Sequence, residues 1–360
     1  MGINVLCYNL PENSWCKLGE IPPAFIRRYN FVPCDGQLYG TVQERSTSNY
    51  RIQSLKQVTY NLYSDSCTEL PALEEGRYLR KTFVSNGDEL YALLSEPCVA
   101  NHLRSLQLPS CFNQHTSFLT KYQRETNSWE DVTSFDHLGL RDDFCIVAND
   151  NFIYFIGGRG YCGHKITILT DVDRFELSRK QWDKAANTQT AKWRASGAAV
   201  NGKIYIMGPS ALLQACPSSY DWEVYDETTN EWQIITGVRD GLGYSYVDIL
   251  AVDGELYHVD IKAVVRGVSE CHPKRIRIQR YYREENKWQT TTDVTARDTV
   301  FFCGRPAIVC SMSIFKGLFN MRQVEAFPFD DSLPVATSTQ PSLNVTSKKV
   351  RKQERKCLIM

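Results

Sequence analysis

Residues 225–232 read "YDETTNEW", and the spacing of seven residues from an aromatic residue to a tryptophan recurs along the chain. The other copies are "YNLPENSW" (8–15), "YQRETNSW" (122–129), "FELSRKQW" (175–182) and "YYREENKW" (281–288), while "YNLYSDSC" (60–67) ends in cysteine. The residues between the two ends are mostly polar and favour turns. Each copy therefore predicts a β-hairpin in which the aromatic residue ends one strand and the tryptophan opens the next.

A second pattern precedes each hairpin: a tight turn followed by a short apolar strand that carries a tyrosine. The copies are "DGQLYGTV" (35–42), "NGDELYALL" (86–94), "NDNFIYFIGG" (149–158), "NGKIYIMG" (201–208) and "DGELYHVD" (253–260). Asn-Gly and Asp-Gly favour tight hairpin turns because both residues tolerate positive φ. With the apolar strand ahead of each turn, four strands recur in about 50 to 60 residues, the length of a propeller blade. A closed ring buries both faces of each blade, so the aromatic residues are predicted to be core.

This pattern resembles the kelch repeat, a four-stranded blade with a double glycine after its second strand and a Tyr…Trp pair around its last hairpin. The double glycine is present at Gly157 and Gly158 and is replaced elsewhere by "GTV", "ALL", "MGP" and "HVD". The resemblance covers roughly residues 1–330 and is to the weaker blades of BTB–kelch proteins, the substrate adaptors of cullin-3 ubiquitin ligases. It implies an all-β, six-bladed kelch β-propeller with four-stranded blades.

The complete blades are expected at residues 24–71, 78–133, 140–185, 193–235 and 244–291. The segment "INVLCYNLPENSWCKL" supplies the last two strands of a sixth blade, and "DTVFFCGRPAIVCSMS" supplies its first two. Pairing of these N- and C-terminal strands is expected to close the ring, with "RQVEAFPF" (322–329) left as an extra strand. Since Met1 falls inside a blade, two interpretations stay open: a propeller-only protein, or a chain preceded by BTB and BACK domains.

Eleven residues before each second-strand tyrosine lie Arg28, Arg80, Asp143, Arg194 and Tyr246, with Arg297 near the same place in the incomplete blade. Equivalent positions that begin the innermost strands are expected to ring one mouth of the channel. Arginines in such a ring suit carboxylate or phosphate groups, and the resemblance implies short acidic peptide motifs as ligands. The alternative is that these arginines pair with acids of the protein itself, such as Glu74, Glu75 or Asp142. The insertions 94–117, 159–170 and 260–276 are further candidates for recognition.

Composition and motifs give no sign of catalysis, of a cofactor or of nucleic-acid binding. The net charge is +0, the thirteen cysteines form no CxxC pair, and the six histidines form no legible ligand set. We therefore predict free thiols, no catalytic residues and no metal. The main interpretation is a protein-recognition module, with cullin-3 as partner if a BTB domain precedes it. The alternatives are a propeller-only cytoskeletal or membrane scaffold and, more remotely, a copper enzyme similar to galactose oxidase.

Residues 331–360 are expected to form a separate, disordered tail. A stretch rich in Ser, Thr and Pro leads to a basic run and the ending "RKCLIM". Cys357 stands in a C-a-a-X prenylation pattern whose final methionine favours farnesyl, and a polybasic run is the usual second signal for an anionic membrane. With no signal peptide or transmembrane run, we expect a cytoplasmic protein held at membranes by this tail. A nuclear-localisation-like patch or chance is the alternative.

Overall fold

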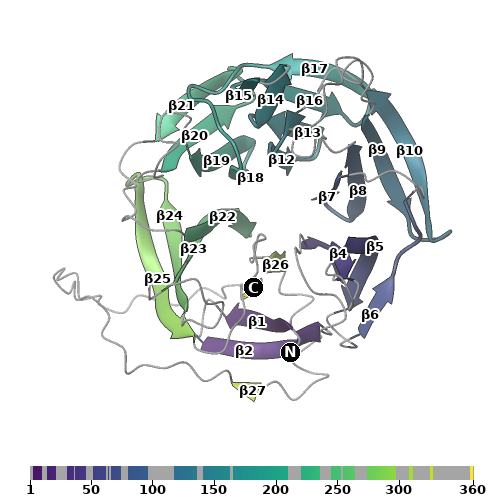
Figure 1. The fold of residues 1–360 in the computed structure, drawn as a ribbon. Helices are drawn as coiled ribbons and strands as arrows, with labels where there is room; N and C mark the ends of the chain where they lie inside the picture. Colours follow the sequence, from purple (N-terminus) through teal and green to yellow (C-terminus); the bar gives the residue numbers. More distant parts are fainter. Residues whose placement is uncertain are drawn as a thin grey trace.

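The computed structural model describes residues 3–9, 14–21, 31–35, 37–45, 52–61, 64, 66–73, 80–95, 117–135, 141–162, 165–209, 220–235, 245–252, 254–263, 274–296, 308–310, 325–326 and 357–359. Its strands form five four-stranded antiparallel sheets, one five-stranded sheet and one three-stranded sheet. Figure 1 shows the larger sheets arranged as blades around a central opening. An all-β propeller with four-stranded blades is therefore confirmed.

The five four-stranded blades lie where the repeats predict them. Blade 1 is β3 (Phe31–Cys34), β4 (Gln37–Arg45), β5 (Ile52–Asn61) and β6 (Ser66–Glu69); blade 2 is β7 (Arg80–Asn86), β8 (Glu89–Ser95), β9 (Ser117–Gln123) and β10 (Ser128–Phe135). Blade 3 is β12 (Cys145–Ala148), β13 (Phe152–Ile156), β16 (Val172–Glu176) and β17 (Gln181–Ala185). Blade 4 is β18 (Ser196–Val200), β19 (Lys203–Pro209), β20 (Tyr220–Asp226) and β21 (Glu231–Ile235); blade 5 is β22 (Ser245–Val252), β23 (Glu255–Ala263), β24 (Lys274–Tyr282) and β25 (Lys287–Ala296).

The terminal strands correct the expected count of six four-stranded blades. They form a five-stranded sheet in the order β26 (Ile308–Cys310), β28 (Cys357–Ile359), β1 (Ile3–Asn9), β2 (Ser14–Ile21) and β27 (Glu325–Ala326). β26 contacts both β22 and β3, so this sheet lies between blades 5 and 1 (Figure 1). The N- and C-terminal strands do pair, and the leftover segment adds β27 at the outer edge, alongside β2.

The second strand of the terminal sheet comes from the end of the chain, which the sequence analysis assigned to a disordered tail. Cys357 pairs with Asn9 on one side and with Cys310 on the other. A short strand between β1 and β26 supplies hydrogen-bond partners to backbone N–H and C=O groups that would otherwise be unpaired at the edges of those two strands. The expectation of disorder is therefore wrong for residues 357–359, and the rest of 331–360 lies outside the described residues.

Three of the repeated hairpins whose turns the structure describes carry an asparagine five residues after the tyrosine. Asn127, Asn230 and Asn286 adopt positive φ of 49°, 54° and 47°, a conformation that asparagine tolerates better than most residues. Each side-chain oxygen accepts a hydrogen bond from the hydroxyl of Tyr122, Tyr225 or Tyr281, at 2.6, 2.8 and 2.6 Å. The side chain therefore ties the turn to the strand before it.

The tryptophans and tyrosines pack between neighbouring blades, as predicted. Tyr154 and Ile156 of blade 3 share one buried cluster with Ile204, Tyr225 and Trp232 of blade 4. The Trp232 indole also donates to the carbonyl of Ala186 at 2.8 Å, and the Trp129 indole donates to that of Pro71 at 3.1 Å. Each of these tryptophans thus binds the connection that leaves the preceding blade, which holds the two blades together.

Candidate functional site

Two predicted binding residues, Asp143 and Arg194, meet where the innermost strands of blades 3 and 4 begin. The backbone N–H of Arg194 donates to the carbonyl of Asp143 at 2.7 Å, and Arg194 Nε lies 3.2 Å from Asp143 Oδ2. Both residues have φ of 51°, a conformation that costs a residue with a Cβ about 1 kcal/mol or more. Backbone strain of this kind is common at functional sites.

Arg159 and Trp193 complete this cluster, which we call the mouth cluster: Asp143, Arg159, Trp193 and Arg194. Arg159 Nη2 lies 2.7 Å from Asp143 Oδ2, so one buried carboxylate holds both arginines. Their guanidinium carbons lie 5.6 and 5.0 Å from the centre of the Trp193 ring, close enough for cation–π attraction. The Arg194 side chain is 64% exposed, and Nε is its only nitrogen that hydrogen-bonds to a described side chain.

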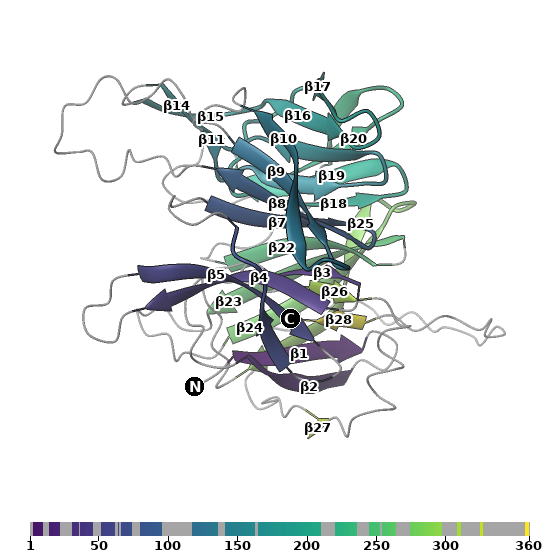
Figure 2. The ribbon, with the colours of Figure 1, turned by 90° about the vertical axis from the view of Figure 1, so that its right-hand side faces the viewer.

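A small three-stranded sheet supports the mouth cluster from one side. It consists of β11 (Arg141–Asp142), β14 (Arg159–Cys162) and β15 (Lys165–Ile168), and it projects from one face of the ring (Figure 2). Arg141 anchors it, because its buried guanidinium binds Asp173 Oδ2 at 2.6 Å and the carbonyls of Phe155 and Asp171 at 3.0 and 2.7 Å. Burial lowers the pKa of Arg141, and Asp173 opposes that shift.

The connection between blades 3 and 4 supports the cluster from the other side through a fully buried ion pair. Lys192 Nζ lies 3.0 Å from Glu223 Oε1, and neither side chain is exposed. Glu223 also accepts hydrogen bonds from the backbone N–H of Gln189 and Thr190, at 2.7 and 3.1 Å. These bonds fix the segment that leads directly into Trp193 and Arg194.

The double glycine of blade 3 allows the chain to pass close to this connection. Gly158 N–H donates to the Lys192 carbonyl at 2.6 Å. Gly157 has φ of 63°, and a Cβ there would lie 2.4 Å from the Lys192 oxygen. A residue with a side chain would therefore both strain the backbone and collide with Lys192. The motif singled out in the sequence thus has a structural role beside the mouth cluster.

The structure brings together two of the six predicted binding residues. Arg80 begins β7 and Tyr246 lies in β22, both innermost strands, but their side chains are outside the described part of the structure, as are Arg28 and Arg297 altogether. Arg194 pairs within the protein, as the alternative expected, although its partner is Asp143 rather than Asp142. A complete ring therefore stays a prediction.

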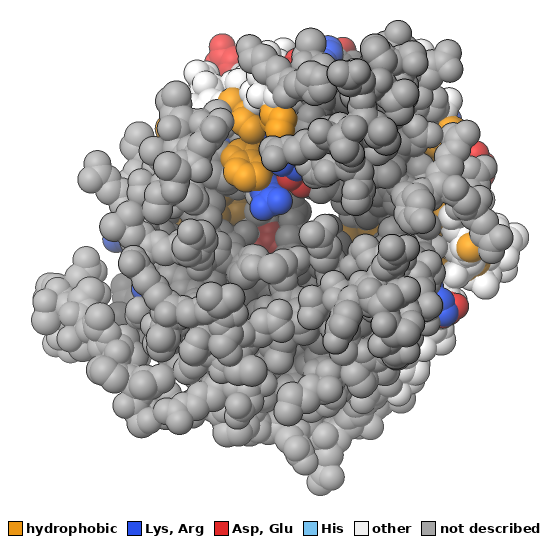
Figure 3. All heavy atoms as spheres, in the orientation of Figure 1, with side chains coloured by type: hydrophobic (Ala, Val, Ile, Leu, Met, Phe, Trp, Pro, Cys, Tyr) orange, Lys and Arg blue, Asp and Glu red, His pale blue; other side chains and the backbone are white. Residues whose placement is uncertain are grey.

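Sequence reasoning missed Arg159 and Trp193 as site residues. Arg159 opens the insertion 159–170 that was singled out for recognition, so the signal was present without a residue assigned to it. Trp193 precedes Arg194 but lies outside the repeat spacing, and only the fold places it beside two guanidinium groups. Figure 3, viewed toward the face on which β14 and β15 project, shows hydrophobic, basic and acidic side chains meeting beside the central opening.

The described ranges hold no metal site or membrane-spanning helix. No group of three His, Cys, Asp or Glu side chains there is arranged to hold a metal ion. No helix in those ranges has the length and apolar character needed to cross a membrane. Cys34, Cys67 and Cys145 form no disulfide, in agreement with the prediction for these three.

Comparison with known proteins agrees with the fold and the repeat. The chain is 23% identical over 224 residues to Kelch-like protein 25 of Xenopus tropicalis and 26% identical over 146 residues to Kelch-like protein 40 of Xenopus laevis. These matches span 60% and 40% of this chain. The domain is a kelch-repeat propeller resembling the kelch domain of kelch-like proteins. No protein-family profile matches the chain.

The kelch propeller has further relatives that agree on architecture. An F-box/kelch-repeat protein of Arabidopsis thaliana is 29% identical over 115 residues. The solved structure of YjhT covers 77% of this chain with a TM-score of 0.52 and 13% identity, which supports the fold alone. The matches span only 35% of the Xenopus tropicalis protein and 22% of the Xenopus laevis one. The kelch-like relatives support a protein-interaction module.

Proposed function

We propose that the kelch propeller is a non-catalytic module that binds short acidic segments of partner proteins at the mouth cluster. The observation that carries this proposal is the exposed Arg194 guanidinium, which Asp143 holds by Nε alone while Trp193 lies against it. Its two terminal nitrogens can therefore grip a carboxylate bidentately. Arginine clusters of this kind recur where proteins recognise acidic or phosphorylated motifs.

Two single variants, one at the mouth cluster and one elsewhere on the surface as a control, test this proposal. Arg194→Gln removes the charge at the mouth cluster, and Arg179→Gln removes one from a turn of blade 3, where the side chain is 74% exposed. Partners recovered by affinity capture and mass spectrometry should be lost with Arg194→Gln and kept with Arg179→Gln. The combined variant of Arg28, Arg80 and Arg194 extends the test to the predicted ring. Retention of every partner by that variant would sink the proposal.

The proposed setting is substrate capture for a cullin-3 ubiquitin ligase, with the cullin bound by a BTB domain on the natural chain. The kelch-like relatives support this setting through their kelch region only, since the matches span 22 to 35% of their length. The second candidate is a propeller-only cytoskeletal or membrane scaffold. A sequenced transcript separates them: an upstream BTB-coding exon favours the adaptor, and stop codons directly before Met1 favour the scaffold. The copper-oxidase alternative fails if purified protein carries no stoichiometric metal.

We also propose that Cys357 is farnesylated and that the basic run completes a membrane anchor, which places the protein in the cytoplasm at membrane surfaces. The support is the C-a-a-X sequence and the six Lys and Arg residues between 348 and 356. Because residues 357–359 pair with β1 and β26, the tail must leave the terminal sheet before an enzyme can modify it. Cys357→Ser should release the protein from the membrane fraction of fractionated cells. An unchanged distribution would count against the anchor.

A further inference from the structure

Three of the interfaces between neighbouring blades, which we call seams, carry a charged residue two positions after the third-strand tyrosine. These residues are Arg124 between blades 1 and 2, Glu227 between blades 3 and 4, and Arg283 between blades 4 and 5. They lie in the hairpin turns at the end of the blades opposite to the mouth cluster, because antiparallel strands alternate in direction. The three positions are equivalent, so their partners can be compared directly.

Two of these residues have side-chain partners within the neighbouring blade. Arg124 forms an ion pair with Asp35 of blade 1 and binds the Asp88 carbonyl of its own blade at 2.7 Å. Glu227 accepts hydrogen bonds from the Tyr154 hydroxyl and the Asn149 amide of blade 3. Each of these seams is therefore satisfied internally.

Arg283 keeps only half of the arrangement seen for Arg124. Its Nη2 donates to the Gly254 carbonyl at 3.3 Å, and Gly254 stands three residues before Tyr257 as Asp88 stands three before Tyr91. The place of Asp35, four residues before the second-strand tyrosine of the preceding blade, is taken by the neutral Asn201. No described carboxylate lies within ion-pair distance of Arg283, which is exposed and lies over the Tyr205 ring at 5.7 Å.

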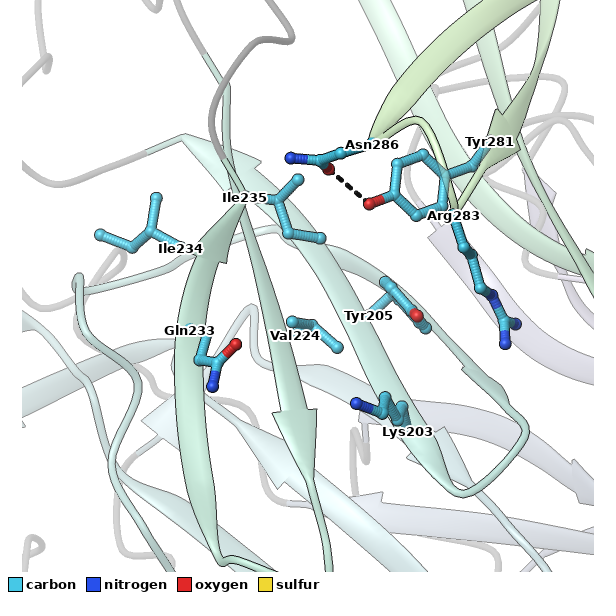
Figure 4. Close-up of a pocket in the computed structure, with 9 residues that line it drawn as sticks. All are labelled: Lys203, Tyr205, Val224, Gln233, Ile234, Ile235, Tyr281, Arg283 and Asn286. Carbon is cyan, nitrogen blue, oxygen red and sulfur yellow. Dashed lines mark hydrogen bonds between the residues drawn. The ribbon is translucent and has the colours of Figure 1, made fainter.

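A cavity of about 330 Å³ opens beside Arg283 in the same seam (Figure 4). Tyr205, Val224 and Ile235 of blade 4 and Tyr281 of blade 5 give it apolar walls, and Lys203 lies at its lower end in the view of Figure 4. Lys203 is paired with Asp226 at 3.1 Å, so Arg283 is the cation that this cavity leaves without a counter-ion among the described residues. The volume falls within the range of ligand-binding pockets.

We infer that this seam is a second binding site, for a protein segment that carries an Asp or Glu beside an aliphatic or aromatic residue. The carboxylate of the segment takes the place that Asp35 occupies toward Arg124, and its apolar neighbour packs against Tyr281 and Ile235. Charge complementarity decides this choice of ligand, because Arg283 has no counter-ion among the described residues and the side chains of Tyr281 and Ile235 beside it are apolar.

A variant that restores the missing carboxylate tests this inference most sharply. Asn201→Asp copies the arrangement of Asp35, whose φ of 46° nearly equals the 50° of Asn201, so the turn accepts the change. The new carboxylate should pair with Arg283 and compete with any ligand. Arg283→Gln removes the cation itself, and Arg194→Gln at the opposite end of the blades is the matched control.

The probe is a displayed library of random dodecapeptides selected on the full chain. Protein with Arg194→Gln, in which the mouth cluster is disabled, should enrich peptides with an acidic residue beside an apolar one, and the double variant of Arg194→Gln with Asn201→Asp should not. A selected peptide should bind at least about tenfold more weakly to Asn201→Asp and to Arg283→Gln in fluorescence anisotropy, as expected for loss of a charge-assisted contact. Changing its acidic residue to the amide should have the same effect.

Several outcomes would overturn the inference. One is that the Arg194→Gln variant selects the same peptides with and without Asn201→Asp, and another is that no peptide selected by the Arg194→Gln variant depends on Arg283. Enriched peptides without a carboxylate would also do so. Because Arg194→Gln reports on the mouth cluster separately, loss of binding there and loss of binding at this seam are distinguishable.

Discussion

Asp143 and Arg194 stand at equivalent positions of neighbouring blades, share a φ of 51°, and are joined by both a backbone hydrogen bond of 2.7 Å and an ion pair of 3.2 Å. The same local conformation thus recurs at the start of two innermost strands. Because the second residue donates its N–H to the carbonyl of the first, the two blades fix the direction of the Arg194 side chain. The mouth cluster is therefore held by the backbone as well as by charge.

Arg194→Gly and Arg194→Ala should separate stability from binding. Glycine removes the left-handed penalty of about 1 kcal/mol and adds a similar entropic cost of about 0.5–1 kcal/mol. Its free energy of unfolding should therefore stay within about 1 kcal/mol of wild type, whereas alanine keeps the penalty; both variants lose the ion pair with Asp143. Urea denaturation measures the difference, and both variants should lose acidic-peptide binding at the mouth. A glycine variant less stable than the alanine one would contradict this account.

Lys192→Met should be among the most destabilising single changes in blade 4. It leaves Glu223 buried without its cation, and an uncompensated buried charge costs about 3–5 kcal/mol. Lys192→Met combined with Glu223→Gln should recover part of that loss, because no buried charge remains and the single amide oxygen still accepts from one of the two N–H groups, that of Gln189 or that of Thr190. Chemical denaturation of both variants provides the measurement. A double variant as unstable as the single one would show that the charge is not the cause.

Gly157→Ala and Gly87→Ala form a matched pair, since both glycines have positive φ, 63° and 56°. A Cβ at Gly87 meets nothing within 4 Å, so that change should cost only the backbone term of about 1 kcal/mol. At Gly157 the same Cβ would lie 2.4 Å from the Lys192 carbonyl oxygen and must displace the connection to Arg194. The Gly157 variant should therefore be less stable by a further 1–3 kcal/mol, about the cost of overpacking. Equal thermal unfolding of the two would refute the collision.

Cys34 should make stability fall with pH in the alkaline range. Burial raises the pKa of its thiol to about 11, from an ordinary value near 9.0, although Arg124 opposes the shift. Between those values the unfolded chain releases the proton that the folded protein retains, so the free energy of unfolding decreases as pH rises. The stability difference between wild type and Cys34→Ala should shrink from pH 9 to pH 11 in urea titrations. A constant difference would exclude the thiol as a contributor.

The sequence by itself determined the blades. Tyr122, Asn127 and Trp129, and their counterparts in the other copies, act within one hairpin or across one seam, so their spacing in the sequence carries their structural meaning. The position eleven residues before each second-strand tyrosine also identified Asp143 and Arg194, which meet in the structure. Local turn chemistry and periodic burial are encoded over a few residues, which is why a single sequence suffices for them.

Only the tertiary structure decided which side chains meet across blades. Arg159 and Trp193 lie 34 residues apart, yet they share the mouth cluster because the connection before β18 passes over Gly157 and Gly158. Asn201, which leaves Arg283 without a counter-ion among the described residues, is recognised only by comparison with Asp35, three seams away. The terminal sheet likewise recruits residues 357–359 from the far end of the chain. These contacts between distant parts of the chain depend on how the ring closes and on which backbone groups lack hydrogen-bond partners. No periodic pattern in the sequence predicts them.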